Sequence, residues 1–262
     1  MKKLLLPLLT ILFFISCQKQ ISTDKASKEI AGTAANKQAK FTVCHYDAVT
    51  GTSKTILVPQ NALATHLAHG DLQGDCSAVL TTICDQDWMV KNMDVSIYRN
   101  GDPIPQVSDP SAWSALTTGA WCYYNNDAAN EAIYGKLYNW YAINDPRGLA
   151  QTGWHVPSDA EWTALETCLG ENAGGKMKTT GTIEEGTGLW SSPNIGATNS
   201  SGFTGLPGGV RDNAGAFLEF HRFGFWWSST EYGIRFLRYS DASAGRGSSN
   251  KTNGFSVRCV RD

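Results

Sequence analysis

Alternating apolar and polar positions predict several short strands in the C-terminal part of the chain. Residues 88–93 (WMVKNM) alternate and predict an early strand. Residues 225–229 (FWWSS) and 235–239 (RFLRY) are further strand candidates. In residues 255–259 (FSVRC) the apolar side chains alternate with Ser and Arg, so this run predicts a last strand whose Cys259 faces the core.

Two other runs have the spacing of helices. Residues 133–143 (IYGKLYNWYAI) repeat apolar side chains at helical intervals and predict a helix. Ser158 followed three positions later by Glu161 is a capping-box signature. Gly170 is a stop signal, so a second helix is predicted from Ser158 to about Leu169.

The first residues predict export. Lys2 and Lys3 precede an apolar run, 4–15, that is too short to span a bilayer as a stable anchor. A small residue directly before Cys17 resembles the lipobox of bacterial lipoproteins. Residues 1–16 are then a lipoprotein signal peptide, and Cys17 is the lipidated residue. The expected location is the outer membrane or cell surface, lipid-anchored. The alternative is an ordinary secretory signal with a chance Cys.

Composition divides the mature chain into three parts. Residues 17–39 hold no aromatic residue and read as a flexible tether. All nine tryptophans lie at or after Trp88, whereas three of the five histidines lie between 45 and 69. We therefore expect a small Cys/His segment, 40–76, and a main domain, 84–262. A segment this small usually needs a disulfide or a metal.

The formal net charge is −2, and no cluster of Lys and Arg occurs. This argues against nucleic acid as a partner, because phosphate binding needs concentrated positive charge.

Six cysteines follow Cys17, an even number that suggests disulfides in an oxidising compartment. Six cysteines allow 15 pairings, so the sequence alone does not choose among them. In order of preference, the predicted pairs are Cys168–Cys259, Cys44–Cys76 and Cys84–Cys122.

Two hypotheses concern the Cys/His segment. His66 and His69 are three positions apart on an expected helix, with Cys44 and His45 upstream and Cys76 downstream. Zinc takes such nitrogen and sulfur ligands, so Cys44, His66, His69 and Cys76 are candidate ligands. The other hypothesis is a Cys44–Cys76 disulfide with the histidines as packing or surface groups. The oxidising compartment favours the disulfide.

From Cys84 onward the chain resembles the Fibrobacter succinogenes major paralogous domain, common in surface proteins and lipoproteins of Bacteroidetes. The matching motifs are 87–93 (DWMVKNM), 121–126 (WCYYNN), 134–140 (YGKLYNW), 153–158 (GWHVPS), 206–211 (LPGGVR), 226–231 (WWSSTE) and 256–260 (SVRCV). The family has no agreed biochemical activity. Residues 43–76 resemble a short segment found in other proteins of these bacteria.

The resemblance implies an α+β fold of the C-type-lectin-like superfamily. Two helices would pack on a small, twisted, mostly antiparallel sheet with long loops. In lectin-like domains a Cys on a helix pairs with a Cys on the last strand, a pattern that Cys168 and Cys259 match. Residues 157–162 also resemble the helix signature of formylglycine-generating-enzyme-like domains.

Residues 226–231 form the best candidate ligand surface. Trp226 and Trp227 could stack on sugar rings, while Ser229 and Glu231 could bond hydroxyl groups. The alternative is that one or both tryptophans fill the core. Arg211 and Asn213 could present a second polar loop to a ligand, although a structural role for the arginine is the stronger alternative. The Glu-Pro-Asn and Trp-Asn-Asp signatures of calcium-dependent lectins are missing.

Enzyme signatures are also missing from the sequence: G-x-S-x-G, H-E-x-x-H and a phosphate-binding glycine loop do not occur. We therefore predict no catalytic residue and no cofactor. The expected function is a lipid-anchored, non-catalytic binding module for glycan or another surface macromolecule. One alternative is an enzyme related to formylglycine-generating or polysaccharide-active proteins. Another is a purely structural or adhesive surface protein.

Overall fold

The computed structural model describes residues 39–262, so the signal peptide, Cys17 and nearly all of the expected tether lie outside the described residues. The described residues belong to one compact unit. Within the described part of the chain, no helix combines the length and the apolar character needed to cross a membrane.

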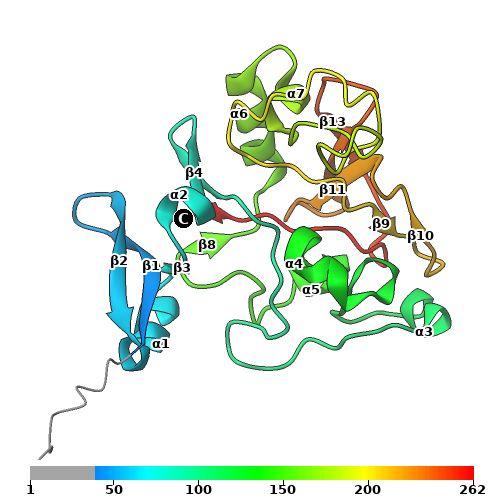
Figure 1. Cartoon of the computed structure of the whole chain (residues 1–262). Helices are drawn as coiled ribbons and strands as arrows, with labels where there is room; N and C mark the ends of the chain where they lie inside the picture. Colours follow the sequence, from blue (N-terminus) through cyan, green and yellow to red (C-terminus); the bar gives the residue numbers. More distant parts are fainter. Residues whose placement is uncertain (1–38) are drawn as a thin grey trace, which may run out of the picture. The chain divides into compact units, whose positions relative to one another are not determined.

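The described chain begins with a hairpin. Strands β1 (Lys40–Asp47) and β2 (Thr52–Pro59) pair antiparallel, and β3 (Leu72–Gln73) pairs with the other edge of β1. Helix α1 (Gln60–Ala68) connects β2 to β3, and the short α2 (Cys76–Val79) follows (Figure 1). No residue of α1 is fully buried.

A disulfide between Cys44 and Cys76 closes this segment, as predicted. Because α1 contributes no buried residue, the covalent link compensates for a very small core.

The segment packs against the rest of the unit through the turn after α1. The indole N–H of Trp154 donates to the carbonyl of Gly70 at 2.9 Å. Gly70 has φ of +97°, and a Cβ there would lie 2.2 Å from the carbonyl oxygen of Thr152. Only glycine allows this approach. A further contact joins Arg261 to Tyr46, with the guanidinium 4.0 Å from the ring centroid.

A four-stranded antiparallel sheet brings distant parts of the chain together. Its order is β4 (Leu80–Ile83), β5 (Gln86–Met89), β14 (Val260–Arg261) and β8 (Trp154–His155). The last strand thus lies between an early hairpin and a strand from the middle of the chain. The strand predicted over 88–93 is confirmed only in its first two residues.

A second sheet contains β11 (Phe223–Trp227), β12 (Gly233–Arg238) and β13 (Gly245–Ser248), all antiparallel. The strands predicted in these regions are confirmed, with shifted bounds. Two-stranded pairs join β6 (Trp121–Cys122) to β7 (Leu137–Tyr138) and β9 (Val210–Arg211) to β10 (Phe217–Leu218).

The helices after α2 are few and mostly short. They are α3 (Pro110–Ser114), α4 (Glu131–Tyr134), α5 (Trp140–Ile143), α6 (Asp159–Leu169) and α7 (Ala173–Met177), with 3-10 turns η1 (Tyr124–Asn126) and η2 (Ala128–Asn130). Mixed helices and several small antiparallel sheets agree with the predicted α+β class.

Helix α6 confirms the capping-box prediction. The Ser158 hydroxyl accepts from the Glu161 amide at 3.3 Å, and the Glu161 carboxylate accepts from the Ser158 amide at 2.7 Å. Gly170, with φ of +68°, ends the helix. Trp162 and Leu165 are buried on its inner face.

The single helix predicted over 133–143 is wrong. Gly135 has φ of +71° and ends α4, and a Cβ there would lie 2.6 Å from the Met93 carbonyl oxygen. Leu137 and Tyr138 then pair with β6, and Asn139 caps α5. The helical spacing of apolar residues reflects burial of three separate elements, not one continuous face.

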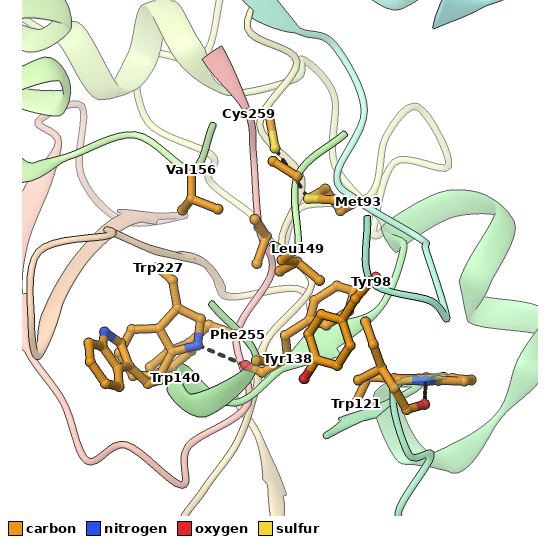
Figure 2. Packing of buried hydrophobic residues seen from close by; sticks show 14 of the residues in the cluster. Met93, Tyr98, Trp121, Tyr138, Trp140, Leu149, Val156, Trp227, Phe255 and Cys259 are labelled. Carbon is orange, nitrogen blue, oxygen red and sulfur yellow. Dashed lines mark hydrogen bonds between the residues drawn. The ribbon is translucent and has the colours of Figure 1, made fainter. Parts of the chain in front are cut away.

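Each of the two larger core clusters contains four tryptophans. One includes Trp227 and Tyr138, and the indole N–H of Trp227 donates to the Tyr138 carbonyl at 2.7 Å (Figure 2). The other includes Trp88, Trp162 and Trp226.

The predicted last strand over 255–259 differs from the structure. Phe255 and Ser256 make only isolated bridges to Tyr138 and Trp226, and the strand itself is β14. Both sides of the run are buried, since Ser256 and Arg258 are 2 % and 0 % exposed. The segment passes between the two clusters, so apolar and polar residues alike lose contact with solvent.

The predicted pairs Cys168–Cys259 and Cys84–Cys122 are wrong. Cys84 pairs with Cys168, and Cys122 and Cys259 are the free cysteines of residues 39–262. Cys84 lies in the turn between β4 and β5, whereas Cys259 points into the core, with its sulfur 3.2 Å from that of Met93 (Figure 2). Burial raises the pKa of both free thiols to about 12, so they stay protonated and unreactive near neutral pH.

Candidate functional site

The two tryptophans of the predicted ligand surface are buried. Trp226 and Trp227 are 1 % and 0 % exposed, so neither can stack on a sugar ring in this structure. Their side chains leave opposite faces of β11, but each face meets a core cluster. The Trp226 indole N–H donates to the Asn92 side-chain oxygen at 2.9 Å, which satisfies its buried polar atom. The alternative stated above, that the tryptophans fill the core, is confirmed for both.

Arg211 is also buried rather than available to a ligand. Its guanidinium donates to the carbonyl oxygens of Val107 and Ser108 and lies 4.5 Å from the ring centroid of Trp113. It therefore joins separate loops. Asn213 is exposed on the adjacent turn, so it is free of that packing role.

Part of the predicted surface does border a hollow. Ser229 and Glu231 are exposed, and the Ser229 amide donates to the Pro157 carbonyl at 2.9 Å. Glu231 lines an open, polar hollow of about 420 Å³ between the start of α6 and the β12–β13 hairpin. The side chains around it are those of Asp159, Thr230, Glu231, Arg246 and Ser248.

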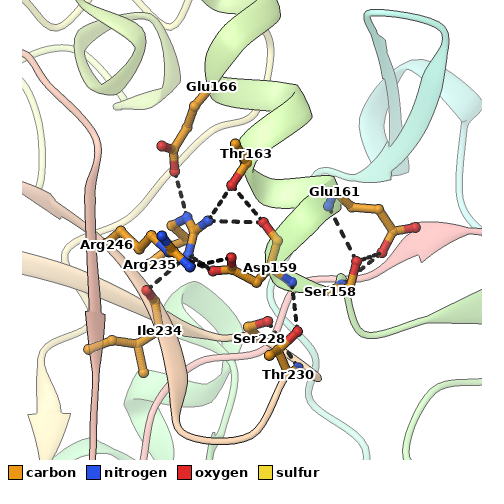
Figure 3. Close-up of polar contacts among 10 residues, drawn as sticks. All are labelled: Ser158, Asp159, Glu161, Thr163, Glu166, Ser228, Thr230, Ile234, Arg235 and Arg246. Atoms are coloured by element: carbon orange, nitrogen blue, oxygen red, sulfur yellow. Dashed lines mark hydrogen bonds and ion pairs between the residues drawn. The ribbon is translucent and has the colours of Figure 1, made fainter.

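A buried arginine holds one wall of this hollow. Arg235, 2 % exposed, donates to Asp159 at 2.6 Å and to Glu166 at 2.7 Å (Figure 3). Arg246 donates to both oxygens of Asp159, at 2.9 and 2.7 Å, and the Asp159 amide donates to the Thr230 hydroxyl at 3.0 Å. The first turn of α6 is thereby fixed to two strands of the second sheet.

The pKa values of the two carboxyl groups in this network shift in opposite directions. Burial acts to raise the pKa of Asp159, but hydrogen bonds from Arg235 and Arg246 outweigh it and hold the pKa below its ordinary value. At Glu166 burial prevails over the attraction of Arg235, and the pKa is raised. Asp159 is therefore an ionised acceptor with two cationic partners, which suits hydrogen bonding rather than proton donation.

Asp159 lies within the helix predicted from Ser158, and neither Arg235 nor Arg246 was singled out from the sequence. A signal was available, because an arginine that is buried inside an apolar strand run needs hydrogen-bond acceptors. The sequence does not show which groups supply them.

The predicted metal-ligand set is not formed, because Cys44 and Cys76 are joined to each other. His66 and His69 do come together, but with His45 and Asp71. One Asp71 carboxylate oxygen lies 2.8 Å from His45 Nδ1, 2.7 Å from His66 Nδ1 and 3.1 Å from His69 Nε2.

These four residues form the group in 39–262 whose donor atoms could hold a metal ion, all within 4.8 Å of one another. Burial acts to raise the pKa of Asp71, but hydrogen bonds from the Tyr46 amide and the three imidazoles lower it below its ordinary value. His45 was visible in the sequence beside Cys44. Asp71 was not identified, although it lies two positions after His69.

A known protein family matches most of the described chain, but the match does not include the group of His45, His66, His69 and Asp71. The Fibrobacter succinogenes major domain family matches residues 81–261, more than half of the chain. No curated protein and no solved structure matches the chain. The matched region begins within β4 and includes the hollow and both large core clusters. The chain therefore belongs to the Fibrobacter succinogenes major domain family.

Proposed function

We propose that this protein is a non-catalytic binding module of the cell envelope, anchored through lipidated Cys17, and that it binds glycan at the polar hollow. The observation that carries the proposal is the wall of the hollow. Asp159 is held between Arg235 and Arg246, beside the exposed hydroxyl of Thr230. Fixed donors and acceptors of this kind suit the paired hydroxyl groups of sugars.

Tyr232 replaces the buried tryptophans as the proposed stacking surface. It stands between two residues that line the hollow and is 47 % exposed. The ammonium of Lys251 lies 4.9 Å from its ring centroid and pairs with Glu231 at 2.5 Å. An aromatic face beside hydrogen-bonding groups is the usual arrangement for a small polar ligand with an apolar side.

The same contacts favour binding over catalysis. Hydrolysis of a glycosidic bond needs one carboxylic acid and one carboxylate across the substrate. Asp159 is ionised between two guanidinium groups, and Glu231 is paired with Lys251. A formylglycine-generating type of enzyme needs reactive cysteines. Cys122 and Cys259 are buried, with the pKa of each raised to about 12.

A C-type-lectin-like fold is the finer part of this proposal. It is supported by α6 packed beside small antiparallel sheets, and by the long irregular segment 178–209 between α7 and β9. Fold alone is weak support for a ligand class, since one fold hosts many functions.

A glycan array tests the binding proposal. The probe is the mature chain with Cys17→Ser, which removes the proposed lipid attachment point. We expect binding to at least one glycan class, weakened about tenfold or more by Arg246→Ala and by Tyr232→Ala, since each removes an interaction worth about 1.4 kcal/mol or more. Ser111→Ala, at an exposed position of α3 that does not line the hollow, is the control. Failure to bind any glycan, or equal binding by all three variants, would refute the proposal.

Membrane attachment is tested separately. Cells that express the natural chain should incorporate labelled fatty acid into it and hold it in the membrane fraction, because several acyl chains give stable anchoring. The Cys17→Ser chain should be unlabelled. Retention of the label in that variant would exclude Cys17 as the anchor.

A further inference from the structure

We propose that His45, His66, His69 and Asp71 bind one divalent transition-metal ion of the zinc class, at a structural site outside the family domain. The four residues precede residue 81, where the family match begins. The proposal does not depend on glycan binding at the hollow.

Three elements converge to build the site. His45 lies on β1 directly after the disulfide-bonded Cys44, so strand alternation directs it to the opposite face. His66 lies in the last turn of α1, and His69 is the residue that caps its C-terminal end. The amide of Asp71 donates to the His66 carbonyl at 3.2 Å, which folds the chain back and brings the carboxylate to the imidazoles.

The carboxylate of Asp71 is oriented in advance. One of its oxygens accepts from the Tyr46 amide at 3.0 Å, and the other faces the three histidine nitrogens. The turn that carries it is held by the Trp154 indole on the Gly70 carbonyl. Such supporting hydrogen bonds are typical of metal-ligating groups.

Hydrogen bonds to Asp71 alone do not give the three histidine rings adequate partners. A single carboxylate oxygen would have to accept from three ring nitrogens, although it offers about two lone-pair positions. The Asp71 side chain is only 1 % exposed, so water cannot complete its solvation. A cation would receive a lone pair from each imidazole and neutralise the buried carboxylate at once.

The spacing fits a tetrahedral ion. Zinc bonds to nitrogen and oxygen are about 2.0–2.2 Å, which places ligand atoms roughly 3.3 Å apart. The four donor atoms already lie within 4.8 Å of one another, and the imidazole centroids are 5.3, 5.4 and 6.1 Å apart. Small side-chain rotations therefore bring all four to bonding distance.

The donor set selects the metal class. Imidazole suits zinc, copper and nickel, whereas calcium and magnesium take oxygen ligands. Four protein ligands describe a closed, structural zinc site. A structural role also fits the segment, because α1 buries none of its own residues. His69, with its side chain 52 % exposed, provides the entry path from solvent.

Metal analysis of the mature Cys17→Ser chain tests the site. After removal of metal with a chelator, titration with Zn²⁺ should give one ion per chain and raise the thermal midpoint, since the ion binds the folded state. Replacement of Zn²⁺ by Co²⁺ should give the visible absorption of tetrahedral cobalt. Ca²⁺ should have no effect. Binding of less than half an equivalent of Zn²⁺, or equal stabilisation by Ca²⁺, would overturn the proposal.

Single variants locate the ion. His69→Ala should weaken Zn²⁺ binding by at least the roughly 10–100-fold that outer partners contribute at such sites, and His66→Ala should do the same. His69 is half-exposed, so its variant should fold, and an intact Cys44–Cys76 disulfide in peptide mapping verifies this. The control variant His155→Ala changes a histidine within the region that matches the family, 81–261, and should bind Zn²⁺ normally. Unchanged affinity in the His66→Ala, His69→Ala double variant would place the ion elsewhere and refute the assignment.

Discussion

Cys84 and Cys168 form a disulfide that joins the turn between β4 and β5 to the end of α6. The two residues are 84 positions apart. The covalent link therefore fastens the longest helix of the described chain to the sheet that contains the last strand, without using a cysteine from that strand. Cys259 remains a small apolar residue of the core.

Removal of this link should destabilise the protein. We expect the Cys84→Ala, Cys168→Ala double variant to lose about 2–5 kcal/mol in free energy of unfolding, because the link restricts the unfolded chain over a long loop. Urea denaturation of the oxidised protein measures the loss. Non-reducing peptide mapping should recover 84 joined to 168. A peptide joining 168 to 259 would contradict the structure.

Arg235 and Arg246 bind the same carboxylate but should differ in their effect on stability. Removing one partner of a buried ion pair costs about 3–5 kcal/mol. We expect Arg235→Met to lose an amount of stability at the lower end of this range, since the side chains of Asp159 and Glu166 are 20 % and 23 % exposed. The side chain of Arg246 is 67 % exposed, so Arg246→Met should lose at most about 1 kcal/mol. Chemical denaturation of both variants makes the comparison, and equal losses would contradict the role of Arg235.

Truncation of the buried tryptophans should destabilise the fold rather than remove a binding surface. Trp226→Ala and Trp227→Ala should each lose about 3–5 kcal/mol, since each opens a large cavity in a core cluster. Tyr232→Ala, at an exposed position on the same hairpin, should lose less than about 1 kcal/mol. Thermal unfolding separates the two classes. A stable Trp227→Ala chain would mean that this side chain is not in the core.

His155 should make stability depend on pH. Its ring nitrogens lie 2.7 Å from Asp262 and 2.7 Å from Glu161. Burial acts to lower the pKa of His155, but the hydrogen bonds with Asp262 and Glu161 prevail and raise it above the ordinary 6.5. The folded protein thus holds the proton more tightly than the unfolded chain. This stabilisation is complete below about pH 6.5 and is lost as pH rises through the folded-state pKa.

The His155→Gln variant isolates this contribution. The difference in free energy of unfolding between natural protein and variant should be larger at pH 5.5 than at pH 8.5. We expect a change of at most about 1 kcal/mol, because the imidazole is 38 % exposed and solvent screens its ion pairs. Urea titrations at the two pH values provide the measurement. A difference in free energy of unfolding that grows with pH would contradict the raised pKa assigned to His155.

Short-range signals predicted the local elements well. The capping box at Ser158 and Glu161 and the stop at Gly170 act within a few residues, so they identify α6 from sequence alone. The strands near 225–229 and 235–239 followed from similarly local patterns. The run over 133–143 failed because the left-handed backbone at Gly135 is imposed by the approach of Met93 from another part of the chain.

The sequence by itself determined the family and the capped helix, since motifs and local hydrogen bonds encode these directly. Tertiary structure alone decided which cysteine Cys168 meets, that Trp226 and Trp227 both face cores, and that Asp71 joins three histidines. Each of these depends on where strands from distant parts of the chain pair. Periodicity shows which face of a strand or helix is buried, but only the assembled sheets determine which residues pack against that face.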